Sequence, residues 1–207
     1  RIFEKDKIDY TLRSINSILK SVKHAKNHYT KLDIKIIIID HNSTKENLEK
    51  IIDLLKRSSL TFKLLNLDIA EFKEKIETTN EKNETVSSNQ VSNMSNIYKS
   101  LLLSKKSNDL IYFVEDDYVH ELDSIAEMLF TYERIASLTN DELVICPVDY
   151  PYLYVQAANT KIYLGEKYHW RQINETLCTF LTSKKIVDKH WEKFLSMCTF
   201  EHYPFES

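Results

Sequence analysis

The sequence predicts an α/β fold, a three-layer α/β/α sandwich with a mostly parallel, mixed central sheet. Two observations support this prediction. Up to Val148, short apolar runs alternate with segments whose apolar residues recur at helical spacing. The run at residues 34–39 is nearly continuous in its hydrophobicity, which is typical of a strand buried on both faces of a parallel sheet. Helices that connect such strands by right-handed crossovers complete the sandwich.

The first third of the chain alternates helix and strand. Asp9 can cap a helix whose apolar residues recur every three or four positions. Residues 34–39 form the first strand. Ser43 and Glu46 then have the spacing of a capping box and predict a second helix. Residues 61–67 are predicted to form the next short strand.

A polar stretch at residues 71–92 interrupts this alternation, which then resumes. We interpret the stretch as a loop or flap able to close over a ligand. An amphipathic helix follows from Val91, and residues 110–114 predict a buried strand. The next helix is expected to begin at His120 or Asp123.

In the last part of the chain the predicted elements are shorter, and aromatic residues are more frequent. Its expected elements are a strand at 143–148, a small hairpin of 150–155 with 161–164, a strand at 175–181 and a helix at 183–195.

Composition narrows the function. The chain has 207 residues, enough for one domain, and its formal net charge of -3 gives no broad basic surface for nucleic acid. No apolar stretch approaches the ~20 residues that a transmembrane helix needs.

Three cysteines without disulfide or zinc spacing indicate a reducing compartment, so we expect a cytoplasmic protein, with the inner face of a membrane as a further option. The start lacks an initiator Met and a signal region, and we expect the chain to be trimmed at one end or both.

The single glycine excludes the glycine-rich phosphate loops. Any phosphate must therefore be held by a metal, by side chains or by helix N-termini. Three consecutive acids, Glu115-Asp116-Asp117, directly follow the strand at 110–114. Adjacent like charges repel unless a cation neutralises them, and hard ions such as Mg²⁺ and Mn²⁺ prefer oxygen ligands. The acids therefore predict a metal–phosphate site, with a solvated acidic turn as the alternative.

Two segments together resemble family 2 glycosyltransferases with the GT-A fold. Residues 36–44, which end in Asp40-His41-Asn42-Ser43-Thr44, are similar to that family's strand ending in Asp-Asn-Gly-Ser-Thr. Residues 93–106 and 108–117 are similar to its helix and Asp-x-Asp strand. Here the glycine after Asp-Asn is absent, Glu115 replaces the first acid, and the usual first strand is missing or cut short. The match covers about two-thirds of the chain and fades after Val148.

The resemblance implies a metal-dependent, inverting enzyme with Mn²⁺ or Mg²⁺ as cofactor. Its donor would be a nucleoside-diphosphate sugar of the UDP, GDP or dTDP type, and its acceptor a glycan, a lipid-linked molecule or a protein. One GT-A, Rossmann-like domain would span residues 1–207, with 1–148 binding the donor and 149–207 facing the acceptor. Asp117 and Glu115 would hold the metal, and Asp116 would face the ribose or sugar.

Further contacts to the donor are implied or suggested by position. They are Asp40, Asn42, Asp68, Asn93, Asn96 and Arg171. The alternative for Asp40 is a cap or turn carboxylate, Asp68 is better suited to a turn, and the two asparagines at the start of the third helix are also routine helix-entry residues. Arg171 could pair with a phosphate.

An inverting transferase also needs a base that deprotonates the acceptor hydroxyl. Glu175 and Asp149 are close candidates for this role, with Glu206 behind them. Glu175 lies in a polar and aromatic patch with His169 and Trp170, and Asp149 precedes an aromatic segment that a sugar could stack on.

Three other functions are considered. A nucleotidyltransferase also has acids at strand ends, but it normally carries a glycine-rich loop, which is absent. A haloacid-dehalogenase-type phosphatase needs Asp-x-Asp-x-Thr, and Asp116-Asp117-Tyr118-Val119-His120 lacks the threonine. A degenerate, non-catalytic GT-A domain would bind nucleotide, carbohydrate or a partner protein without turnover.

Overall fold

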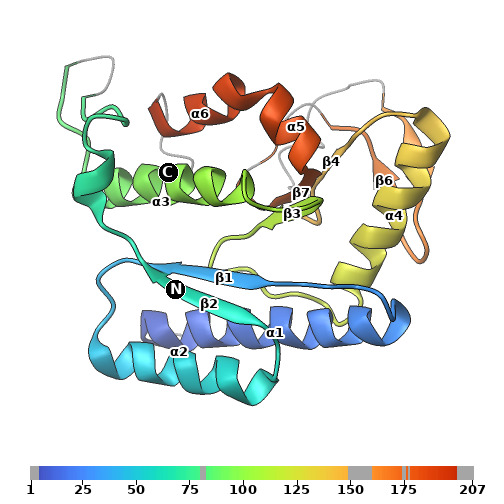
Figure 1. The fold of residues 1–207 in the computed structure, drawn as a ribbon, viewed down its shortest axis with the longest axis horizontal. Helices are drawn as coiled ribbons and strands as arrows, with labels where there is room; N and C mark the ends of the chain where they lie inside the picture. Colours follow the sequence, from blue (N-terminus) through green and yellow to red (C-terminus); the bar gives the residue numbers. More distant parts are fainter. Residues whose placement is uncertain (1–4, 80–82, 149–159, 174–175, 177, 200–207) are drawn as a thin grey trace. The chain divides into compact units, whose positions relative to one another are not determined.

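The computed structural model describes residues 5–79, 83–148, 160–173, 176 and 178–199, which form a mixed α/β fold of helices and small sheets (Figure 1). The α/β class is therefore confirmed. In order, the elements are α1 (Lys7–His28), β1 (Ile36–Asp40), α2 (Lys45–Ser58), β2 (Phe62–Asn66), the 3-10 turn η1 (Ile69–Phe72), α3 (Ser88–Ser104), β3 (Leu110–Phe113), α4 (Ser124–Thr139), β4 (Val144–Ile145), β5 (Ile162–Leu164), β6 (His169–Arg171), β7 (Phe180–Ser183), α5 (Lys184–Lys189) and α6 (Trp191–Thr199).

The described strands form three small sheets, in the orders β1-β2, β3-β7-β4 and β5-β6. The Ile36 N–H donates to the Thr61 carbonyl, and the Leu67 N–H donates to the Asp40 carbonyl. Strands β1 and β2 therefore begin together and end together, as parallel neighbours do. The β5-β6 pair is antiparallel. Small separate sheets replace the expected central sheet within the described part of the chain.

The chain folds as two compact units, and each is described by itself. Unit 1 comprises residues 1–36, 44–62 and 112–181, and unit 2 comprises residues 37–43, 63–111 and 182–207.

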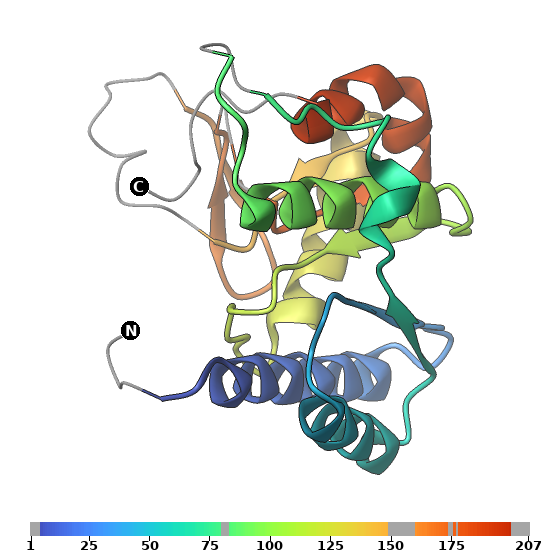
Figure 2. The same ribbon diagram turned by 90° about the vertical axis from the view of Figure 1, so that its left-hand side faces the viewer.

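In unit 1, helix α1 packs against both α2 and α4. Figure 2 shows α1 and α2 running side by side. Leu19 and Val22 of α1 are buried, as is Ile125 in the first turn of α4. The side chain of Asp123, at the N-cap position of α4, makes no capping hydrogen bond. Ser21 on α1 accepts the Ile125 N–H instead, at 3.0 Å, so a neighbouring helix caps α4.

In unit 2, α3 packs against α6 and η1. It begins at Ser88, earlier than predicted, because Ser87 and Gln90 form a capping box that the sequence analysis missed. The stretch predicted as a loop or flap also buries apolar side chains, with Phe72 1% and Ile76 6% exposed. Part of the stretch is therefore anchored in a core.

Several local predictions were wrong. Thr44, rather than Ser43, caps α2 by accepting the Asn47 N–H, whereas the Ser43 N–H donates to the Asp40 carboxylate. Strand β1 is half-buried rather than buried on both faces. The predicted helix at 183–195 is two helices separated at His190, whose φ of -115° and ψ of 30° are not helical.

The small hairpin also differs from the prediction. Strand β5 pairs with β6, in the register Ile162 with Arg171 and Leu164 with His169. The segment 150–155, which was expected to pair with residues 161–164, lies outside the described residues.

Candidate functional site

The acidic turn, Glu115-Asp116-Asp117, follows β3 in unit 1. Glu115 is half-buried and anchored by Thr179, which is 1% exposed. The Glu115 N–H donates to Thr179 Oγ1, and this hydroxyl is also 3.3 Å from Glu115 Oε2, to which it donates. The first acid of the turn therefore has a structural partner.

Asp116 is exposed, and its Oδ2 atom faces the start of α1. It accepts a hydrogen bond from Thr11 Oγ1 at 3.0 Å and lies 3.8 Å from Lys7 Nζ. Asp117 is exposed, and its carboxylate makes no hydrogen bond or ion pair with any residue that the structure describes. The turn is thus held through its first two acids, and the third is directed to solvent.

These residues fit a divalent cation only in an open arrangement. Over the described ranges, no group of three His, Cys, Asp or Glu residues is arranged to hold a metal. Asp117 and the Oδ1 atom of Asp116 remain available as hard oxygen ligands. Mg²⁺ characteristically keeps several waters and takes one or two carboxylates together with substrate phosphates. The acidic turn is suited to that kind of ligand set.

His120 is a candidate that sequence reasoning treated only as a helix start. Its Nε2 atom lies 2.8 Å from the Tyr112 hydroxyl, and its backbone N–H donates to Ser17 Oγ. Burial lowers the pKa of the His120 imidazole, which favours the neutral ring that a general base requires. The signal available in the sequence was a histidine three residues after Asp117.

The nearby thiols are not activated. Burial, with a further contribution from the negative charge of Glu115, raises the pKa of Cys178 to about 12. Burial also raises the pKa of Cys146. Because the thiolate is the nucleophile, neither cysteine suits nucleophilic catalysis.

In unit 2, the carboxyl end of β1 meets the beginning of α3. Ser92 Oγ lies 2.8 Å from His41 Nδ1, and Asn96 Nδ2 donates to the Ile39 carbonyl at 3.5 Å. The half-buried Asp40 carboxylate accepts the Ser43 N–H. The predicted residues Asp40 and Asn96 therefore share one polar neighbourhood, to which His41 and Ser92 also belong.

The other predicted residues of unit 2 have local structural roles or are exposed. Asn42 has a left-handed backbone, with φ of 62°, a conformation that asparagine tolerates better than most residues. Asp68 caps η1 by accepting the Ala70 N–H at 2.9 Å, which is the turn alternative. Asn93 is exposed in the first turns of α3.

In the segment predicted to face the acceptor, Arg171 is half-buried on β6 and His169 is exposed on the same strand. Asp149, Glu175 and Glu206 lie outside the described residues. The three proposed catalytic bases thus remain predictions.

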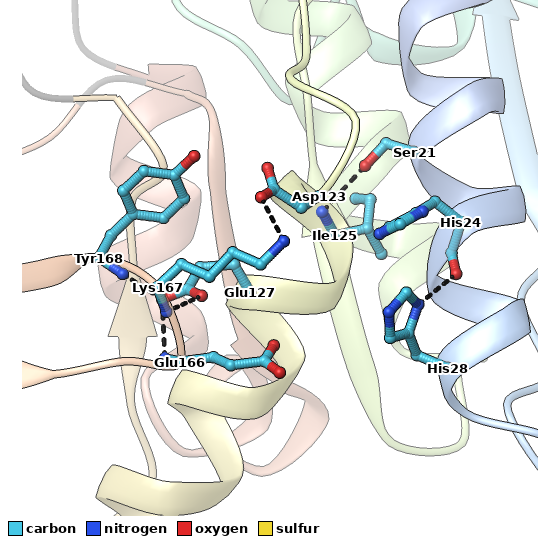
Figure 3. Close-up of polar contacts among 9 residues, drawn as sticks. All are labelled: Ser21, His24, His28, Asp123, Ile125, Glu127, Glu166, Lys167 and Tyr168. Carbon is cyan, nitrogen blue, oxygen red and sulfur yellow. Dashed lines mark hydrogen bonds and ion pairs between the residues drawn. The ribbon is translucent and has the colours of Figure 1, made fainter.

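Another acid of unit 1, Glu127, was not singled out in the sequence. It is 2% exposed and accepts hydrogen bonds from the turn that joins β5 to β6 (Figure 3). The donors are the backbone N–H groups of Glu166, Lys167 and Tyr168, the Trp170 Nε1–H and the Thr131 hydroxyl, at 3.2, 2.9, 3.4, 3.0 and 3.2 Å. Through these hydrogen bonds, Glu127 attaches the β5-β6 hairpin to α4. The second strand of this hairpin carries His169 and Arg171.

The single glycine explains how the hairpin approaches so closely. A Cβ atom at Gly165 would collide with the Glu127 carboxylate and would lie 2.6 Å from Thr131 Oγ1. Only a residue without a side chain fits at this point.

Comparisons with protein-family models, curated proteins and solved structures find no match to this chain. Among the described helices, none combines the length and hydrophobicity needed to cross a bilayer.

Proposed function

We propose that this chain is a metal-dependent glycosyltransferase that moves a sugar from a nucleoside-diphosphate donor to a glycan, lipid-linked or protein acceptor, with inversion. Its fold is proposed to be of the GT-A type and its location cytoplasmic. The observation that carries the proposal is the acidic turn, in which Thr179 holds Glu115 and the start of α1 holds Asp116. This leaves Asp117 exposed, as a ligand for a hydrated cation must be.

The residues have distinct proposed roles. Asp117, with Asp116 Oδ1, would hold Mg²⁺ or Mn²⁺ on a diphosphate, and such an ion neutralises the charge of the leaving group. Glu115 would keep the turn in place through Thr179. Within unit 2, the contacts of His41 and Asn96 hold the end of β1 beside Asp40, and the resemblance to GT-A enzymes assigns Asp40 and Asn96 to nucleoside binding.

The test is thermal unfolding against UDP, GDP, dTDP and CMP, each with and without Mn²⁺. A ligand that binds only the native state raises Tm, by several degrees when its concentration greatly exceeds Kd. We expect one nucleotide to act, only with the metal, and Asp117→Asn to abolish the shift. Glu121→Gln, which changes another exposed acid nearby, should keep it. If no nucleotide raises the Tm of the wild-type chain, the proposed donor site is wrong.

Turnover needs a separate measurement. The wild-type chain should release nucleoside diphosphate from the matching nucleotide sugar in the presence of metal, and Asp117→Asn should reduce this rate by at least tenfold. Binding without release would favour the second candidate.

That candidate is a degenerate, non-catalytic domain that binds a nucleotide without turnover. One observation favours it, the position of Lys7 Nζ 3.8 Å from Asp116, where an ammonium group already supplies positive charge. In this case the wild-type chain should show the nucleotide-dependent Tm shift but release no nucleoside diphosphate, and Lys7→Met should weaken the shift.

A further inference from the structure

Two histidines project from the same side of α1 near its end. His24 and His28 are four residues apart, so their side chains are neighbours on one helix face. Their ring centroids are 4.3 Å apart, with the ring planes inclined at 52°. Figure 3 shows both rings on the side of α1 that faces α4. Two imidazoles at this spacing on a helix form the same pair that binds zinc in His-x-x-x-His metalloprotease helices.

A hydrogen bond orients the second ring. His28 Nδ1 lies 2.9 Å from the His24 carbonyl oxygen, which can only accept, so Nδ1 carries the proton. The lone pair of the neutral His28 ring is therefore on Nε2, the atom away from this bond. Metal-ligating histidines commonly donate their other ring N–H to a carbonyl in this way, which fixes tautomer and orientation.

Acidic side chains lie near this end of α1. Glu166, Glu133 and Glu127 act electrostatically on Tyr29, the residue after His28, and Asp123 acts electrostatically on His24. Lys167 is paired with Asp123 at 2.9 Å, and Lys26 is the basic residue between the two histidines in the last turn of α1.

We infer that His24 and His28 form a binding site for a transition metal ion, with Zn²⁺ as its simplest probe. The structure shows no third His, Cys, Asp or Glu completing a metal cage over the ranges it describes, so the ion would keep water in its remaining positions. Imidazole ligands suit Zn²⁺, Cu²⁺ and Ni²⁺, whereas Mg²⁺ and Mn²⁺ suit carboxylates.

This site is separate from the acidic turn. Asp116 contacts Thr11 near the beginning of α1, and His24 lies thirteen residues further along the same helix. An α-helix rises about 1.5 Å per residue, so the two places are about 20 Å apart along α1. The histidine site does not depend on the proposed glycosyltransferase function, and the two proposals can fail independently.

The experiment is calorimetric titration of the whole chain with ZnCl₂, in buffer that contains Mg²⁺. We expect one zinc ion per chain, with affinity at least tenfold lower in His24→Ala and in His28→Ala. His190→Ala, which removes a half-buried imidazole elsewhere, and Asp117→Asn should both leave the affinity unchanged. Circular dichroism of each metal-free variant checks that it is folded, which alanine in a helix favours.

A relocation variant tests the geometry itself. His28→Ala combined with Lys26→His keeps the number of histidines but places the second imidazole two residues from His24, on another face of α1. It should bind as weakly as His28→Ala alone. Zinc affinity equal to wild type in His24→Ala or His28→Ala, or full affinity in the relocation variant, would overturn the inference.

Discussion

Glu127 and Asp117 are both carboxylates of unit 1, and they occupy opposite environments. Glu127 is 2% exposed and surrounded by hydrogen-bond donors from a turn about forty residues away, whereas Asp117 is exposed and has no partner within the described ranges. A buried carboxylate must be satisfied to be tolerated, but an exposed one has no such requirement. The difference separates an acid that holds the fold from an acid available to a ligand.

The largest effect is expected for Glu127→Ala. Removing the carboxylate leaves buried donors of the β5-β6 turn without their acceptor, and we expect the free energy of unfolding to fall by about 3–5 kcal/mol. Urea unfolding measures this. Glu133→Ala changes an exposed acid on the same helix and should cost less than about 0.5 kcal/mol. Equal losses for the two variants would mean that Glu127 does not fix the hairpin.

Gly165→Ala should follow, with a loss of about 1–3 kcal/mol, because the added methyl group collides with Glu127 and crowds Thr131. In the Glu127→Ala background the same substitution should cost less, since the carboxylate that it meets is gone. A double-mutant cycle in urea measures this coupling, and strictly additive losses would contradict it.

The sequence predicted those parts of the fold that depend on neighbouring residues. The helical spacing of Leu19 and Val22 identified α1, and the apolar run before Glu115 identified β3. Caps were less predictable, because several nearby polar residues compete for one helix end. At α2, Thr44 is the cap although its neighbour Ser43 has the capping-box spacing.

The role of Glu127 could not be predicted, because its donors arrive from a distant turn and its place on α4 looks like any charged helical position. The single glycine showed only that phosphate loops were absent. The role of Gly165 depends on the close approach of the Glu127 carboxylate, and this approach exists only in the folded chain. In the candidate site, the sequence indicated Asp40 and Asn96 but not Ser92 or His41, whose contact joins residues 51 positions apart.

A smaller effect is expected from His120, which is half-buried and carries an imidazole. Burial lowers the pKa of His120 in the folded chain, so below about pH 6.5 the unfolded chain binds a proton that the folded chain does not. Stability should therefore be full above this pH and decline as the pH falls below it. His120→Gln, whose amide can still meet Tyr112, should flatten this part of a urea-unfolding pH profile, and His190→Gln should not. If the pH profile of His120→Gln is the same as that of the wild-type chain, other titratable groups cause the loss of stability at low pH.

The smallest effect on stability is expected at Asp117, and it completes the comparison with Glu127. Asp117→Asn removes a charge that no described residue satisfies, next to the acids Glu115 and Asp116, so the free energy of unfolding should stay within about 0.5 kcal/mol of wild type. The removal of one like charge from the turn acts in the stabilising direction. Urea unfolding without metal measures this directly. A loss of 2 kcal/mol or more would show that Asp117 is structural after all, and the loss of a nucleotide-dependent Tm shift in this variant would then report damage to the fold rather than the removal of a ligand for the metal.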